Sequence, residues 1–178
     1  RDSGFTIKVG VRNIDSINSN LLKSDIVYDS IENVSSWADL ICILVSDSSI
    51  PEVFNSKIKN HINENDTILF SHGYNITYNL IQPPENIDVV MVAPSGGGQM
   101  VRDEYKRDKG VPALLAVHQN YSGNALDITK AYSKAIGSAK ICAFLSTFKE
   151  ETETDLFGEQ VLLTGGLPMM IEKSLKVL

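Results

Sequence analysis

The sequence predicts an α/β protein with a doubly wound parallel sheet that carries helices on both faces. Seven short apolar runs rich in β-branched residues alternate with stretches of helical spacing, as in successive βαβ units. Several of these runs are apolar throughout, which is typical of strands covered by helices on both sides. The expected strands are Thr6–Val11, Asp25–Tyr28, Asp39–Val45, Thr67–Phe70, Ile87–Ala93, Ala113–Val117 and Lys140–Leu145.

Helices are expected between the strands, where apolar residues recur every three or four positions. The predicted ranges are Asn18–Lys23, Ile31–Ala38, Ile50–Asn63, Gln99–Lys106, Gly123–Ile136, Glu151–Leu163 and Pro168–Leu178. In an open parallel sheet, ligands bind beyond the carboxyl ends of the strands. The residues that follow each strand are therefore the first candidates for a site.

Composition limits the classes of partner. The chain has 178 residues, of which 43% are hydrophobic and 21% charged, and its net charge is −6. An acidic chain without a Lys/Arg cluster does not suit a phosphate backbone, so we expect no nucleic-acid partner. No apolar run approaches the length of a membrane span and no charged leader opens the chain, so we expect a cytoplasmic protein. Cys42 and Cys142 lie in apolar runs and are expected to be free core thiols.

The most unusual stretch is Phe148–Gln160, which packs five carboxylates into thirteen residues. Read as a helix, it places Glu151, Asp155 and Glu159 four residues apart on one face. Three like charges in a row destabilise a helix unless a cation lies over them, and Mg²⁺ prefers carboxylate oxygens. A solvated acidic face remains the alternative.

The residues after the first strand bear on the choice of dinucleotide. A basic residue at this position, such as Arg12, favours the 2′-phosphate of NADP. The nearby Asp15 would repel that phosphate and would instead accept hydrogen bonds from free ribose hydroxyls. A surface turn with incidental charges explains the same residues equally well.

Two further strand ends carry small residues in front of a helix. After the third strand, the hydroxyls and free N–H groups of Ser46–Pro51 could meet a ribose or a phosphate, although an ordinary N-cap accounts for them too. After the fifth strand, the glycine run in Pro94–Gln99 could receive an anion or the face of a nicotinamide. Turns also use glycine, and the chain contains no Gly-x-Gly-x-x-Gly between a first strand and a first helix.

His72 differs in position from the other two histidines. It stands at the end of the fourth strand, and Gly73 after it allows the backbone to approach a ligand closely. An imidazole at this place could donate or accept a proton near neutral pH. His61 and His118 are assigned to ordinary polar or surface roles.

Three stretches carry a family resemblance: Val89–Pro94, Gly110–Gln119 and, above all, Thr147–Gln160. Together they closely resemble the ketol-acid reductoisomerase (acetohydroxyacid isomeroreductase) family in its shorter form, along essentially the whole chain. The resemblance implies a Rossmann-like cofactor domain at residues 1–146, without its first βα unit. Residues 147–178 would then be the first helices of an all-helical, metal-binding C-terminal domain.

The resemblance also implies an activity. Members of this family use NADPH and Mg²⁺ to convert 2-acetolactate or 2-aceto-2-hydroxybutyrate, which are 2-hydroxy-2-alkyl-3-oxo acids, into dihydroxy acids. The reaction is an alkyl migration followed by hydride reduction, in valine and isoleucine biosynthesis. Because the family's helical domain forms dimers, a homo-oligomer is implied for the full protein.

By position, the resemblance assigns roles to individual residues. His72 matches the active-site histidine, and Asp155 and Glu159 match the first two metal-ligand carboxylates. The matching cofactor positions are Arg12, Asp15, Ile17, Asp47, Ser48, Ser49, Ile50 and Gly98.

The sequence departs from the family pattern at several places. Ser95 stands where members carry a lysine beside the substrate, and Asp15 and Ile17 stand where two serines hold the 2′-phosphate. NADH is thus an alternative cofactor. The phosphate loop would have to precede Arg1 and the remaining metal carboxylates would have to follow Leu178, so we expect a piece of a longer protein that is inactive alone.

Two other functions are alternatives to this activity. The departures at Ser95, Asp15 and Ile17 suit a catalytically impaired relative that keeps the nucleotide-binding fold as a binding or assembly module. A dehydrogenase of the hydroxyacid type would need a catalytic lysine in a long domain-crossing helix, which the sequence does not show.

Overall fold

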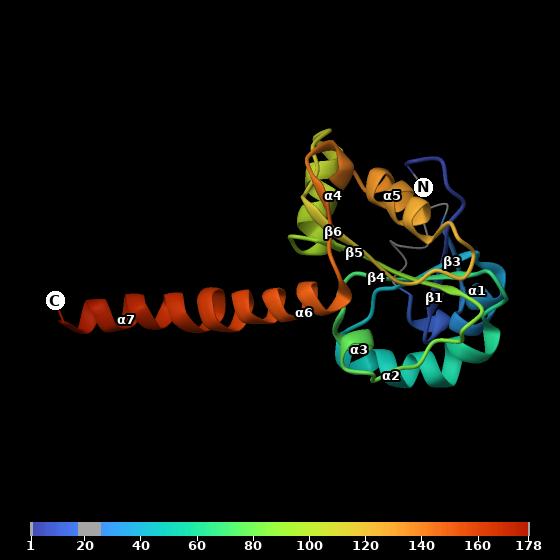
Figure 1. Ribbon diagram of the computed structural model, residues 1–178, viewed down its shortest axis with the longest axis horizontal. Coiled ribbons are helices and arrows are strands. Elements are labelled where there is room, and N and C mark those ends of the chain that lie inside the picture. Colours follow the sequence, from blue (N-terminus) through green and yellow to red (C-terminus); the bar gives the residue numbers. More distant parts are fainter. Residues whose placement is uncertain (1, 18–25, 178) are drawn as a thin grey trace.

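The computed structural model describes residues 2–17 and 26–177 and has an α/β architecture (Figure 1). Each of the seven expected strands is present; β4 has the expected bounds, and the ends of the others are shifted by a few residues. The strands are β1 (Lys8–Val11), β2 (Val27–Ser30), β3 (Leu40–Ile43), β4 (Thr67–Phe70), β5 (Asp88–Pro94), β6 (Ala113–Gln119) and β7 (Ala143–Leu145). A five-stranded sheet has the order β3-β4-β5-β6-β7, and β1 and β2 form a separate parallel pair.

Two strands at one edge of the sheet depart from the expected parallel direction. The strands β3, β4 and β5 are parallel, but β6 runs antiparallel to β5, and β7 is parallel to β6. The reason lies in the connection between β5 and β6, which starts and ends at the same edge of the sheet. There Pro94 pairs with Ala113, and the Ser95 N–H donates to the Pro112 carbonyl over 2.8 Å. The α/β fold class is confirmed, with β6 and β7 running opposite to β3, β4 and β5.

Helices cover both faces of the sheet. Figure 1 shows α2 and α3 on one side of the strands and α5 on the other. The helices are α1 (Ile31–Trp37), α2 (Ile50–Val53), α3 (Tyr74–Thr77), α4 (Gly98–Lys106), α5 (Ala125–Ala135), α6 (Phe148–Phe157) and α7 (Leu167–Val177). The helix α2 continues as a π-helical segment, Phe54–Ile58. The helix predicted at Asn18–Lys23 lies outside the described residues.

The core consists of two apolar clusters, one on each face of the sheet. Successive side chains of a strand point to opposite faces, so Ile68 and Phe70 pack in the cluster that contains Phe54, while Leu69 packs with Ala125. All four residues of β4 are buried. This two-sided burial explains why the central strands read as continuous apolar runs.

The C-terminal part is a helical rod that projects from the domain (Figure 1). It begins with α6, continues through a π-helical segment, Gly158–Gly166, and ends with α7. The first turns of α6 pack against the domain, but no residue of Gly158–Val177 is buried. Among the described residues, no helix combines the length and apolar character needed to cross a bilayer.

Candidate functional site

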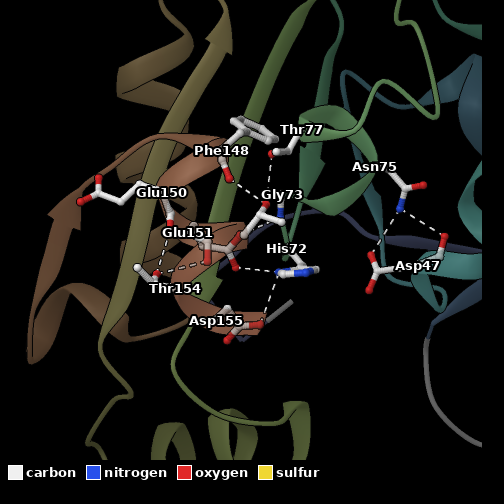
Figure 2. A network of polar contacts seen from close by, with 11 residues as sticks. Asp47, His72, Gly73, Asn75, Thr77, Phe148, Glu150, Glu151, Thr154 and Asp155 are labelled. Carbon is white, nitrogen blue, oxygen red and sulfur yellow. Dashed lines mark hydrogen bonds and ion pairs between the residues drawn. The ribbon is translucent and has the colours of Figure 1, made fainter. Parts of the chain in front are cut away.

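The site lies where two neighbouring parallel strands end. Ser71, His72 and Gly73 follow β4, and Ser46–Ser49 follow β3. Because β3 and β4 are parallel neighbours, these loops meet at the same edge of the sheet. Figure 2 shows His72 between the acidic side chains of α6 and the Asp47 loop.

The carboxylate of Glu151 joins α6 to the loop after β4. Its side chain is buried; Oε1 accepts a hydrogen bond from His72 Nδ1 at 2.9 Å, and Oε2 accepts one from the Gly73 N–H at 2.8 Å (Figure 2). The approach requires a glycine, because a Cβ at position 73 would lie 2.5 Å from Thr152 Oγ1 and 2.6 Å from the Phe148 carbonyl oxygen. Gly73 therefore sets how close the acidic helix comes to the sheet edge.

Local sequence explains why α6 starts where it does. Thr147 is the N-cap, and its side chain accepts a hydrogen bond from the Glu150 N–H over 3.0 Å. Phe148 then packs edge-on against Phe70 at the end of β4, with ring centroids 6.2 Å apart. These two contacts fix the first turn of α6 and orient its acidic face toward His72.

Asp155 completes a cluster with His72 and Glu151. Its Oδ2 lies 3.5 Å from His72 Nδ1, and one ligand atom from each of the three residues lies within 4.8 Å of the others. The hydrogen bond to Glu151 raises the pKa of His72, partial burial opposes the shift, and the charges of Glu151, Asp47 and Asp155 add to it. The imidazolium form is thereby favoured at higher pH than in a free histidine.

The pKa of Asp155 is raised as well. Partial burial is the largest cause, the charge of His72 opposes it, and the carboxylates of Glu151, Glu159 and Asp47 raise it further. Negative charge at this place exceeds what the imidazole can balance. The surplus suits a bound cation.

A cavity of about 390 Å³ opens beside the cluster. Its lining combines hydroxyl, carboxyl and imidazole groups with apolar and aromatic walls. The lining residues are Asp47, Ser48, Pro51, His72, Tyr74, Leu80 and Leu156. The cavity thus brings together the loops after β3 and β4 and one residue of α6.

The structure does not bring all the predicted cofactor residues to this cavity. Arg12 and Asp15 are exposed in the turn after β1, where the Asp15 N–H donates to Asn13 Oδ1, and Ile17 is partly buried. Gly98 is the exposed first residue of α4. A dinucleotide would have to extend across the strand ends to meet these positions.

The loop after β3 divides its predicted residues between the site and the core. Asp47 and Ser48 line the cavity, whereas the Ser49 hydroxyl pairs with Ser46 at 2.9 Å. The side chain of Ile50 is 3% exposed and belongs to the core, so at most its backbone could face a ligand.

Sequence reasoning placed Glu151 and Asp155 on one helix face but gave Glu151 no contact with His72. The available signal was their four-residue spacing. Glu159, predicted as the partner of Asp155, is exposed in the π-helical segment and lies near enough to Asp155 to affect its pKa. Two residues of α3 also reach the site: Tyr74 lines the cavity, and Asn75 Nδ2 donates to the Asp47 carbonyl oxygen at 3.2 Å. Neither carried a sequence signal, because only the docking of α3 places them there.

Comparison with known families fits this arrangement. Residues 1–142 match the family described as acetohydroxy acid isomeroreductase, NADPH-binding domain. The chain belongs to the ketol-acid reductoisomerase family. The family resemblance expected from the sequence is thereby confirmed.

Relatives of the ketol-acid reductoisomerase family match the whole chain. It is 47% identical to a ketol-acid reductoisomerase (NADP(+)) of Pyrobaculum neutrophilum, covering 100% of this chain and 54% of that protein. A ketol-acid reductoisomerase (NADP(+)) of Methanocaldococcus jannaschii is 43% identical, with 100% and 54% covered. The chain therefore spans about half the length of the curated relatives it matches.

A solved structure in the same family has the same fold. It is an NADH-preferring ketol-acid reductoisomerase from an uncultured archean, 34% identical, with a TM-score of 0.91. The similarity covers 99% of this chain and 55% of that one. The projecting helices are thus part of the shared architecture.

Proposed function

We propose that these residues form the cofactor-binding part of a ketol-acid reductoisomerase. The full protein would convert 2-acetolactate and 2-aceto-2-hydroxybutyrate to dihydroxy acids in valine and isoleucine biosynthesis. The observation that carries this proposal is the whole-chain similarity to enzymes of that name at 43 to 47% identity, with His72 and the acidic helix side by side at the strand ends. The protein is proposed to be cytoplasmic and to act as a homo-oligomer.

The proposed boundary between the two domains lies at residues 146 and 147. Residues 1–146 would bind the nucleotide, and residues 147–178 would begin the helical, metal-binding domain. The change from β7 to the capped start of α6 at Thr147 supports this division. The first turns of α6 are nevertheless buried against the first domain.

NADPH is the proposed cofactor, with NADH as the alternative. Arg12 suits a 2′-phosphate, whereas Asp15 and Ile17 lack the hydroxyls that would hold one. We assign Asp47, Ser48, Ser49 and the backbone of Ile50 to the middle of the cofactor. Gly98 at the start of α4 would meet its nicotinamide end.

The carboxylates of Asp155 and Glu159 are the proposed Mg²⁺ ligands. Their oxygen donors suit Mg²⁺, which usually takes one or two protein carboxylates and keeps water and substrate oxygens. Burial is the largest cause of the raised pKa of Asp155, and the neighbouring carboxylates of Glu151, Glu159 and Asp47, which raise it further, are consistent with a cation there. A bound Mg²⁺ would supply Lewis acidity toward the hydroxyl and carbonyl oxygens of the substrate.

In the proposed reaction, His72 would bind and transfer a proton. With Nδ1 engaged by Glu151, His72 presents Nε2 for proton exchange with a ligand. The buried carboxylate of Glu151 fixes the orientation of the ring and favours its charged form. Leu156 and Pro51 would limit the access of water to the cavity.

Turnover by the full-length protein tests this proposal. With 2-acetolactate and Mg²⁺, we expect a dihydroxy acid to form as NADPH or NADH is oxidised. His72→Asn should lower kcat by about 100-fold, since general acid–base groups contribute at least that much. The matched control is His61→Asn, which changes a partly buried histidine outside the site and should leave kcat within about twofold. No product with either cofactor would refute the activity.

A further inference from the structure

We infer that Asn75 is a positioning residue that holds the cofactor loop after β3 in place beside His72. Its consequence for cofactor affinity depends on the proposed function. The contact itself is a property of the free protein. Asn75 would act through the position of Asp47 and would not touch the reacting atoms.

The geometry of Asn75 points to this role. The residue lies in α3 and is 1% exposed. Its Nδ2 donates to the Asp47 carbonyl oxygen at 3.2 Å and approaches the Asp47 carboxylate oxygen Oδ1 at 3.4 Å (Figure 2). One amide therefore holds both the backbone and the side chain of a residue that lines the cavity.

The partners of Asn75 also fix the orientation of its amide. The opposite orientation would place the amide oxygen against two oxygens of Asp47. In the observed orientation Oδ1 is buried and has no hydrogen-bond partner among the described residues. A buried acceptor without a partner is destabilising, so the arrangement is a poor source of stability. The contribution of an asparagine at this position is therefore its two contacts with Asp47.

Asn75 lies in α3, and hydrogen bonds hold α3 against the acidic helix α6. The Gly73 N–H, just before α3, is bonded to Glu151, and at the end of α3 the Thr77 hydroxyl lies 3.1 Å from the Thr152 hydroxyl. The four-residue helix α3 is therefore held on α6 at both ends. Through Asn75, the position of Asp47 is tied to that of His72 and α6.

The expected effect is on binding more than on chemistry. Without the amide, the turn at Ser46–Ser49 keeps its own hydrogen bond from the Ser49 N–H to the Ser46 carbonyl but loses its link to α3. The loop would then sample positions that do not match the cofactor. The loop would have to be ordered again when the cofactor binds, which lowers the affinity. His72 keeps its hydrogen bond to Glu151.

The first test is hydrogen exchange in the full-length protein without ligands. In Asn75→Ala and Asn75→Asp, we expect residues 46–50 to exchange about tenfold faster, with exchange in β5 unchanged. The matched control is Asn124→Ala, which alters an exposed asparagine whose side chain makes no capping hydrogen bond. Unchanged exchange at residues 46–50 in folded variants would overturn the inference.

The second test measures function in the same variants. The Kd of NADPH or NADH should rise about tenfold in Asn75→Asp, and kcat at saturating cofactor should change less than about threefold. A parallel loss of kcat and thermal stability, with Kd unchanged, would indicate a purely structural residue. If the unmodified protein binds neither cofactor, the proposed function fails, while the exchange result still decides the positioning role.

If the Asn75 variants do not fold, Asp47→Ala provides an alternative test of the inference. Asp47 is only partly buried, and this change removes the weaker of the two contacts. Exchange at residues 46–50 should then rise by roughly threefold, because the bond to the backbone carbonyl remains. No rise in this variant would likewise contradict the inference.

Discussion

The acidic helix consists of two parts that differ in burial although they follow one another without a break. In its first turns, Phe148, Glu151 and Thr152 are buried against the sheet. From Phe157 onward the apolar side chains are exposed, so that Phe148 is 5% exposed and Phe157 is 60% exposed. The same kind of side chain, nine residues apart on one helix, is in the core at one end and in solvent at the other.

The difference shows where the site obtains its rigidity. The docked turns touch the loop after β4 through Gly73 and Glu151, and these turns also carry the contact to His72. The projecting part has no such contact within the described residues, and Glu159 lies there. Substitutions in the two parts should therefore have very different effects on stability.

The largest expected effect comes from the aromatic anchor of the docked part. Phe148→Ala removes a buried ring from its contact with Phe70 and should lower the free energy of unfolding by about 3–5 kcal/mol. The matched Phe157→Ala should change it by less than about 0.5 kcal/mol. Urea denaturation of both variants measures the contrast. Equal losses would mean that the two parts do not differ as described.

A smaller loss is expected from the close approach at Gly73. In Gly73→Ala the new methyl group would meet Thr152 and the Phe148 carbonyl and push α6 away, at a cost of about 2–3 kcal/mol. Gly158→Ala is the control, because no atom lies within 4 Å of the added Cβ. That control should be neutral or stabilising by up to about 1 kcal/mol, since alanine favours a helix. Thermal unfolding distinguishes the two variants.

Loss of the buried charge should have an intermediate effect. Glu151→Gln keeps the shape of the side chain but weakens the bonds to the Gly73 N–H and His72, and should lower the free energy of unfolding by about 1–2 kcal/mol. Glu153→Gln changes an exposed carboxylate on the same helix, 3.8 Å from Lys149, and should cost less than about 0.5 kcal/mol. A smaller loss in Glu151→Gln than in Glu153→Gln would contradict the docking role of Glu151.

The last prediction concerns the reactivity of the Cys42 thiol in β3 and involves no loss of stability. Burial raises the pKa of the Cys42 thiol to about 11, and its hydrogen bond with Tyr132 opposes part of that shift. At about pH 8 only roughly one thiol in a thousand would be ionised, and the thiolate is the reactive form. In a Cys142→Ser background, alkylation of Cys42 should be at least about 100-fold slower in native protein than in urea. The native rate should increase as the pH rises toward 11, and equal rates at about pH 8 would contradict this burial.

Much of the fold could be predicted because it depends on local patterns. The run Thr67–Phe70 is apolar and β-branched, and it forms a strand with those bounds. The reversal of β6 could not be predicted, since it depends on how the segment 95–112 folds back to pair Pro94 with Ala113. The direction of a strand depends on how the segment before it folds in three dimensions. The composition of the strand does not indicate it.

The candidate site was predictable in part for the same reason. The place of His72 after a strand, and the four-residue spacing of Glu151 and Asp155, follow from sequence and the geometry of strands and helices. The pairing of His72 with Glu151 does not, because the residues are 79 positions apart and meet only through the approach at Gly73. The contact of Asn75 with Asp47 likewise depends on α3 and the loop after β3, which meet only in the folded protein.

Local patterns were enough to predict the α/β class, the strands, the acidic helix and the family, because the hydrophobic period, the strand-end residues and a long motif can all be read within short stretches of sequence. Contacts between distant segments were needed to show which carboxylate holds the histidine, which strands are reversed and where the helix leaves the domain. The physical reason is that hydrogen bonds and packing between distant segments depend on distances of a few ångströms. Only the packing of the complete sheet and its helices sets those distances.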